Sequence, residues 1–126
     1  MTTPSLEFSE YVLEFLEPIL PIKTGRFFGG VGISCHSVQF AMIMGNSLYF
    51  VVDDESRKKY QQAGMRPFSY STKKGEIQVR RYFEVPEEIL TDIEQLQLWA
   101  NEAVGIAGKS QRNKVGRKNR LSSTKR

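Results

Sequence analysis

A glycine-rich stretch, RFFGGVGI at residues 26–33, is the first place in the sequence where chemistry could occur. Closely spaced glycines can hold a phosphate, but a P-loop also needs a lysine and a hydroxyl residue, and a dinucleotide-binding loop needs a following helix. Strand-like sequence follows Gly29, Gly30 and Gly32 instead. We therefore expect these glycines to lie in one strand, residues 26–34, at a bulge or a close approach of another backbone.

Two short clusters could ligate a metal ion. Cys35 and His36 are adjacent, and each is the only residue of its type. A structural zinc site takes four ligands, so a strand end or a loop is the favoured interpretation. The acidic run Asp53–Glu55 could bind a divalent cation, but carboxylates are also favoured in the first turn of a helix, with Asp53 or Asp54 as the cap. We predict no catalytic residue, metal site or cofactor.

Positive charge is concentrated at the C-terminal end. Of the 18 Lys and Arg residues, eight lie in residues 109–126, where there is no acid, whereas residues 1–108 hold all 14 acidic residues. Such a segment releases counterions on contact with DNA or RNA and has too little apolar surface to fold alone. We predict a basic, flexible tail over residues 109–126, with a solubilising terminus as the alternative. The candidate nucleic-acid-binding residues are Lys109, Arg112, Lys114, Arg117, Lys118 and Arg120.

A second basic cluster is interleaved with aromatic residues, at Arg80 and Arg81 before Tyr82 and Phe83. A strand of this kind can stack bases and hold phosphate. Alternation along a strand sends only one of the two pairs toward any covering helices. An ordinary solvated sheet face is the favoured interpretation.

The bulk composition indicates one domain in the cytoplasm. The chain has 126 residues, of which 40% are hydrophobic, enough for a core. No run approaches the ~18 apolar residues that a membrane span needs, and the first residues have neither the basic start nor the apolar stretch of a signal peptide. One cysteine is consistent with a reducing compartment. We expect no membrane association.

Hydrophobic periodicity and turn residues predict the elements that position these side chains. Alternation in residues 38–44 places Val38, Phe40, Met42 and Met44 on one face, and Gly45-Asn46 is a tight-turn dipeptide. The predicted order is helix 3–19, strands 26–34, 38–44 and 47–52, helix 53–64, strands 66–72 and 76–85, and helix 86–107.

The last predicted helix has its own start and stop signals. Thr91 and Glu94 have capping-box spacing, and Gly108 is suited to end the helix. Its expected buried stripe consists of Ile93, Leu96, Trp99, Ala100, Ala103 and Ala107. Strands joined by tight turns pair antiparallel, and the helices must bury their apolar stripes against them. The sequence thus predicts a two-layer α+β domain, residues 1–108, with a five-stranded antiparallel sheet.

The order and spacing of these features resemble the TfoX N-terminal domain family, also called TfoX/Sxy. The similarity spans residues 22–107 and includes the segments FFGGVGI, FAMIMGNSLYFVVDDESRKKYQQAGMRPFSY, RRYFEVPEEIL and LWANEA. The residues that carry it best are Phe28, Gly29, Gly30, Gly32, Pro67, Phe68, Tyr70, Pro86 and Trp99. The resemblance implies a secretion-chaperone-like fold and a stand-alone N-terminal domain, because a basic tail follows in place of the family's C-terminal helical domain.

The resemblance also implies a function. Full-length members resemble regulators of natural competence that act with the cAMP receptor protein to switch on DNA-uptake genes, and the family has no catalytic residues to carry over. We expect a non-enzymatic interaction protein with a protein partner, such as the transcription machinery or the cAMP receptor protein. The alternative is a sequence-nonspecific nucleic-acid-binding protein that uses residues 109–126. The edge strands of a small sheet need covering, so we also expect a homodimer.

Overall fold

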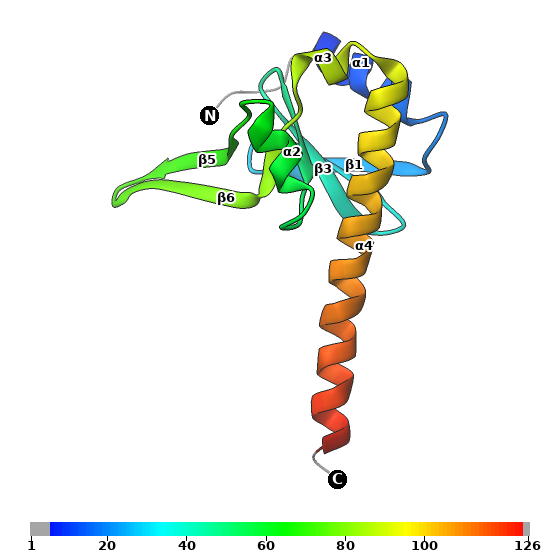
Figure 1. Cartoon of the computed structure of the whole chain (residues 1–126), viewed down its shortest axis with the longest axis vertical. Helices are drawn as coiled ribbons and strands as arrows, with labels where there is room; N and C mark the ends of the chain where they lie inside the picture. Colours follow the sequence, from blue (N-terminus) through cyan, green and yellow to red (C-terminus); the bar gives the residue numbers. More distant parts are fainter. Residues whose placement is uncertain (1–5, 125–126) are drawn as a thin grey trace.

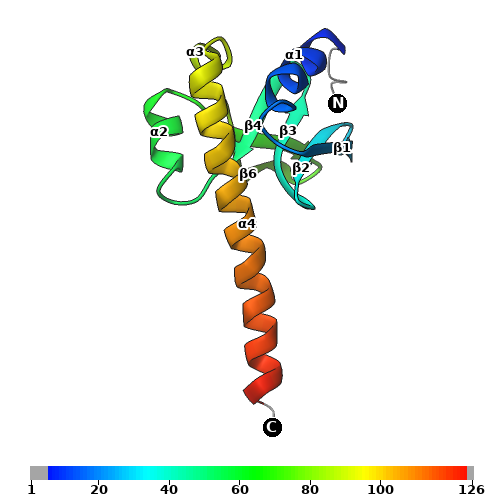
Figure 2. The same ribbon diagram turned by 90° about the vertical axis from the view of Figure 1, so that its right-hand side faces the viewer.

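An antiparallel sheet of six strands and a layer of helices make up the fold. The computed structural model describes the backbone of residues 6–124 and the side chains of residues 7–110. The elements, shown in Figures 1 and 2, are α1 (Leu6–Leu16), β1 (Ile22–Phe27), β2 (Gly30–Cys35), β3 (Val38–Met44), β4 (Ser47–Val51), α2 (Arg57–Gln62), β5 (Pro67–Thr72), β6 (Gly75–Glu84), α3 (Glu87–Leu90) and α4 (Ile93–Thr124). The strand order is β1-β2-β3-β4-β6-β5. The α+β class and the antiparallel sheet are confirmed, but the sheet has six strands, not five.

The sixth strand comes from the glycine-rich stretch. Residues 26–34 do not form one strand: β1 ends at Phe27, β2 begins at Gly30, and the two pair antiparallel. Phe28 and Gly29 form the turn between them, with φ of +49° and +81°. Positive φ at both central residues is typical of the tightest hairpin turns. The sequence does not predict this turn, because an aromatic residue rarely adopts positive φ.

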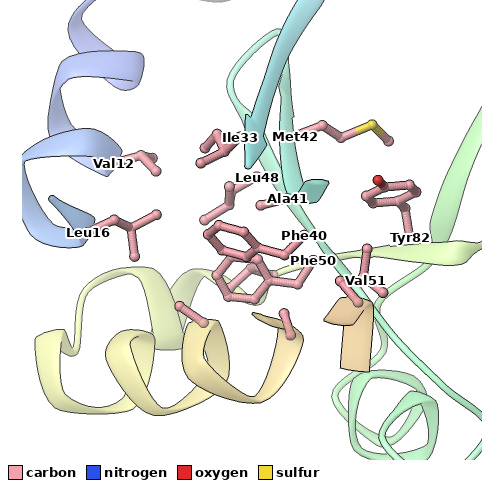
Figure 3. Close-up of a cluster of buried hydrophobic side chains, with 14 of the residues drawn as sticks. Val12, Leu16, Ile33, Phe40, Ala41, Met42, Leu48, Phe50, Val51 and Tyr82 are labelled. Carbon is pink, nitrogen blue, oxygen red and sulfur yellow. The ribbon is translucent and has the colours of Figure 1, made fainter. Parts of the chain in front are cut away.

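The helices cover one face of the sheet. Figure 2 shows α1 and α4 in front of the strands, and Figure 3 shows Val12 and Leu16 of α1 pointing toward the strands. Fully buried residues from β3 and β4, including Phe40 and Phe50, pack beneath them, and their ring centroids are 6.2 Å apart. The buried stripe of α4 holds Leu96, Ala100, Ala103 and Ala107, as predicted, whereas Ile93 is 44% exposed.

A register shift in β3 changes which face Phe40 occupies. Ile33 pairs with Ala41 and the next β2 residue, Ser34, pairs with Gln39, which leaves Phe40 as an extra residue. A bulge of this kind re-aims a side chain. Phe40 therefore packs beside Phe50, while Met42 points to the other face, near Tyr82 (Figure 3). The expectation that Phe40, Met42 and Met44 share one face is wrong for this reason.

Gly30 is required by a close approach of backbone, as expected. A Cβ atom on Gly30 would lie 2.3 Å from the carbonyl oxygen of Ile43 and 2.4 Å from Sδ of Met44. On the same face, a Cβ on Gly32 would lie 2.5 Å from Oε1 of Gln39. The two glycines thus leave room for side chains of β3 to cross β2.

The last predicted helix is interrupted. Thr91 ends α3, and its hydroxyl donates to the carbonyl oxygen of Glu87. Asp92 then starts α4, because its carboxylate accepts a hydrogen bond from the Gln95 amide (3.2 Å). The expected capping box of Thr91 with Glu94 is therefore wrong. Two helices replace the single one predicted over residues 86–107.

α4 continues past Gly108 to Thr124 and projects beyond the sheet (Figure 1). Gly108 does not end the helix, and helical backbone replaces the irregular segment that we expected from residue 109 onward. Flexibility of residues 109–126 stays a prediction.

The β5–β6 hairpin forms a second projection. β6 pairs with β4 only at residues 82–84, so residues 68–81, which we call the arm, extend away from the body (Figure 1). One face of the arm is apolar, because Phe68 pairs with Val79 and Tyr70 pairs with Ile77. Tyr70 and Ile77 are 46% and 42% exposed.

The close approach at Gly30 predicts a stability difference between two glycines. Gly30→Ala should lower the free energy of unfolding by about 2 kcal/mol, because the new Cβ meets a backbone carbonyl that cannot rotate away. Gly105→Ala is the matched control: nothing lies within 4 Å of its Cβ position, so the helix propensity of alanine should raise stability by up to about 1 kcal/mol. Urea unfolding measures both. Equal effects of the two substitutions would show that the β2–β3 contact does not constrain the fold.

Candidate interaction surface

An open groove of about 740 Å³ lies between the arm and the turns of the neighbouring hairpins. Phe28 lines it from the β1–β2 turn, residues 44–47 and Tyr49 line it from the β3–β4 hairpin, and residues 68–71 line it from β5. We call this the aromatic groove. Its lining consists of aromatic rings, a methionine, backbone and small polar side chains, a composition suited to binding rather than to proton transfer.

Phe28 is displayed by the strained turn that holds it. Its side chain is 67% exposed, although its ring packs edge-on against Phe27 with centroids 4.7 Å apart. Positive φ costs a non-glycine residue about 1 kcal/mol. An aromatic residue that is both strained and exposed contributes less to folding than a glycine or asparagine could, so a role at the surface accounts for it better.

The arm supplies the opposite wall. The Phe68 ring packs edge-on against Tyr49 with centroids 5.4 Å apart, and Tyr70 follows at 6.2 Å from Phe68. Four consecutive residues of β5, 68–71, line the groove. Successive strand side chains point to opposite faces, so the edge of β5, rather than one face, borders the groove.

A partly buried hydrogen bond to a carboxylate lies at the groove. Ser47 donates a hydrogen bond from Oγ to Oε2 of Glu84 (3.0 Å), and Glu84 pairs across the strands with Tyr49. Burial raises the pKa of the Tyr49 phenol, and the negative charge of Glu84 raises it further, against a smaller opposing effect of the hydrogen bond from Ser47. Tyr49 therefore stays a neutral hydrogen-bonding phenol over the physiological range.

The structure brings three of the family-motif residues together and separates the rest. Phe28, Phe68 and Tyr70 meet in the aromatic groove. Trp99 lies in the helix layer, where its ring packs against Tyr60 (4.7 Å) below the Lys59 ammonium (4.3 Å).

The remaining motif residues shape the backbone. Pro67 begins β5, Pro86 precedes α3 and accepts hydrogen bonds from the amides of residues 89 and 90, and Gly29 provides a positive φ. Gly30 and Gly32 make room for β3 as described above.

The two candidate metal clusters lie at the end of β2 and in the turn before α2. Cys35 is buried at the end of β2, burial raises the pKa of its thiol, and His36 lies in the β2–β3 turn. Among the described residues, no group of three or more His, Cys, Asp or Glu side chains is placed to hold a metal ion.

The acidic run shapes the turn before α2. The Asp53 carboxylate accepts a hydrogen bond from the Ser56 amide (2.7 Å), while Ser56 Oγ accepts one from the Asp53 amide (3.1 Å). The hydrogen bond from the Ser56 amide is the main cause that lowers the pKa of the Asp53 carboxyl. Asp54 pairs with Arg57 at 2.8 Å. Ser56, rather than Asp53 or Asp54, stands at the N-cap of α2.

The basic residues occupy the junction between the arm and α4. Arg81 donates a hydrogen bond to Ser110 Oγ (3.3 Å), and Arg57 donates one to the Arg80 carbonyl (3.4 Å). Arg80, Arg81 and Lys109 are exposed, so the β6 arginines adjoin the start of the basic segment. The other candidate nucleic-acid-binding residues lie on the helical backbone of α4, and their side chains are outside the described residues: Arg112, Lys114, Arg117, Lys118 and Arg120.

Several groove residues were not singled out as site residues from the sequence: Met44, Tyr49, Ser69 and Ser71. Tyr49 lies between Leu48 and Phe50, whose side chains point toward the helices (Figure 3). The alternation of side chains along a strand could therefore have placed Tyr49 on the opposite face of the sheet. Its contact with Phe68 depends on the bend of β6, between the pairing of Pro67 with Phe83 and that of Phe68 with Val79.

The chain matches the model of a known protein family. The model of the TfoX N-terminal domain matches residues 14–107 of the chain, which include every residue that lines the groove. No curated protein matches the chain significantly. None of the described helices combines the length and the apolar character that a membrane crossing requires.

The electrostatics of Tyr49 can be tested through Glu84. Glu84→Gln should lower the pKa of Tyr49, because a neighbouring negative charge is removed. The folded-state pKa of Tyr49 lies above the unfolded value of about 10, so its contribution to stability is present below that pH and is lost as the pH rises through the folded pKa. Glu84→Gln should therefore lower the pH at which this contribution of Tyr49 to stability is lost.

Ultraviolet titration of tyrosinate measures this shift, with Tyr49→Phe assigning the signal. Glu10→Gln, at an exposed position of α1, is the control and should leave the titration of Tyr49 in place. An unchanged titration in Glu84→Gln would contradict the coupling.

Proposed function

Because the chain belongs to the TfoX N-terminal domain family, we propose that it is a non-enzymatic regulatory protein that acts by binding another protein in the control of natural competence. The aromatic groove is the observation that carries this proposal. Contiguous exposed apolar surface is typical of protein-binding sites, and aromatic residues dominate the energetics of such sites.

The groove has the anatomy of a small recognition site. Phe28, Tyr49, Phe68 and Tyr70 supply rigid aromatic area at little cost in side-chain entropy, and backbone and hydroxyl groups of residues 45–47 supply hydrogen bonds at its rim. The partner is a component of the transcription machinery or the cAMP receptor protein, as the resemblance to competence regulators implies. The protein acts in the cytoplasm, where these partners are.

Deletion of the gene should change transcription of DNA-uptake genes under competence-inducing conditions. Reintroduced Phe28→Ser should fail to restore transcription while keeping the fold, because its side chain is 67% exposed and contributes mainly to the surface. Leu98→Ser is the matched control: Leu98 is 61% exposed on α4, outside the groove, and should restore transcription.

Transcript levels and circular dichroism measure function and folding. Unchanged transcripts in the deletion strain would contradict a role in competence. Restoration by Phe28→Ser would exclude the groove as the partner site.

A second candidate function is sequence-nonspecific binding of nucleic acid. The contact of Arg81 with Ser110 favours it, because this contact joins the basic side of the arm to the start of the basic segment of α4. Arg80, Arg81 and Lys109 then present adjacent positive charge at the base of two projections. Phosphate contacts of this kind bind DNA or RNA without reading bases.

Salt dependence tests this candidate. Combined substitution of Lys109, Arg112 and Lys114 by Gln should reduce the slope of log affinity against log salt by about 2.7, because each lost phosphate contact removes about 0.9 for duplex DNA. Combined substitution of Lys23, Arg26 and Lys58 by Gln removes the same charge from the body and should leave the slope nearly unchanged. Fluorescence anisotropy with a duplex measures both. Equal slopes in the two triple variants would remove the basic segment as the binding element.

A further inference from the structure

The C-terminal half of α4 leaves the body of the protein as a bare helix. We call residues 109–124 the projecting half of α4. Arg81 joins the sheet to the start of this half through its hydrogen bond to Ser110 Oγ (3.3 Å). Figures 1 and 2, which are turned by 90° from each other, show no other described element beside the orange and red part of the helix. A helix without a packed face is only marginally stable, so a ligand along its length would stabilise it.

The charge of the projecting half favours a polyanion as that ligand. Residues 109–126 hold eight Lys and Arg residues and no acid. Like charges three or four positions apart on a helix repel each other, and Lys114 and Lys118 have this spacing. Closely spaced phosphates would remove the repulsion, and the release of their counterions would add to the affinity.

The body beside the projecting half is less suited to phosphate. The turn before α2 adjoins β6, because Arg57 donates a hydrogen bond to the Arg80 carbonyl (3.4 Å). The carboxylates of Asp54 and Glu55 in this turn pair with Arg57 and Lys58, which leaves no excess of positive charge there. We therefore expect the phosphate contacts to extend along the helix rather than over α2.

The absence of aromatic residues favours a duplex over a single strand. Proteins that bind single strands stack the bases on aromatic side chains. Residues 109–126 contain no Phe, Tyr or Trp, and the two aromatic residues that follow the β6 arginines, Tyr82 and Phe83, are buried. Binding must then come from phosphate contacts, which are dense on a DNA duplex, at one negative charge per about 1.7 Å of its axis.

The basic positions form two rows on nearly opposite sides of the helix, at about 3.6 residues per turn. The outer row continues the exposed side of α4 and consists of Lys109, Arg112 and Arg120. The inner row continues the buried stripe beyond Ala107 and consists of Lys114, Arg117 and Lys118. A helix that lies on a charged surface needs one such row, whereas a helix inside a groove meets phosphates on both sides.

We propose that the projecting half of α4 lies in the major groove of a DNA duplex, with one basic row toward each phosphate wall. The major groove is about 12 Å wide, and an α-helix with its side chains is about 10–12 Å across, so the helix fits. The projecting half is about 24 Å long. The major groove of an RNA duplex is deep and narrow and does not admit it. This inference rests on the second candidate function, nucleic-acid binding, and names its ligand.

Two substitutions at Gly116 distinguish a helix in a groove from a flexible basic chain, because both keep the charge. Gly116→Pro breaks the helix and should raise the dissociation constant for a DNA duplex about tenfold or more, since the three basic positions beyond it lose their phosphate contacts. Gly116→Ala favours the helix and should bind at least as tightly as the wild-type chain. Fluorescence anisotropy of a labelled duplex measures both, and Trp99 fluorescence checks that the body stays folded.

The two rows give a second test. Substitution of either row by Gln should lower the slope of log affinity against log salt by about 2.7. The DNA duplex should also bind more tightly than an RNA duplex or a single strand of the same sequence. Equal binding by the two Gly116 variants, an effect of one row only, or equal affinity for the RNA duplex would overturn the inference and leave nucleic-acid binding in place. A chain that binds none of the three nucleic acids would overturn both.

Discussion

The burial of β3 on both faces is the constraint on which the rest of the fold depends. Phe40, Ala41, Met42 and Ile43 are four consecutive residues with no exposed surface. Helices cover only one face of the sheet, so the sheet must cover the other with its own side chains. The bulge at Phe40 sends a large ring to the helix layer, and glycines in β2 let side chains cross on the opposite face. The bulge and the glycines thus both allow β3 to be buried on its two faces.

Local sequence signals predicted the elements that depend on neighbouring residues. The apolar stripe of α1, the Gly45-Asn46 turn and the β5–β6 hairpin are found where periodicity and turn chemistry place them. Errors arose where a residue adopts a conformation or a capping role that the surrounding sequence pattern disfavours. Phe28 adopts a turn conformation that its residue type disfavours, and Asp92 caps a new helix inside a continuous helical pattern.

The candidate site was less predictable than the fold, because its walls are distant in sequence. Phe28 and Tyr70 are 42 positions apart, and they share a groove only because β6 bends after leaving β4. The hydrophobic pattern of the sequence does not predict that bend. It arises from a register shift, because Pro67 pairs with Phe83 and the next residue, Phe68, pairs with Val79. Sequence similarity marked Phe28, Phe68 and Tyr70 as characteristic residues, but only the structure gives them a common surface. Gly30, Pro86 and Trp99 belong to the same motif and support the scaffold.

The position of Trp99 has a spectroscopic consequence. It is the only tryptophan of the chain, and it lies between α2 and α4, against Tyr60 and below Lys59. Tyr60 in turn packs against Phe83, whose strand continues into the arm (6.1 Å between centroids). Intrinsic fluorescence therefore reports the docking of the helix layer, on the opposite side of the sheet from the groove. A change in emission when the groove is filled would mean that the sheet transmits the event through Phe83.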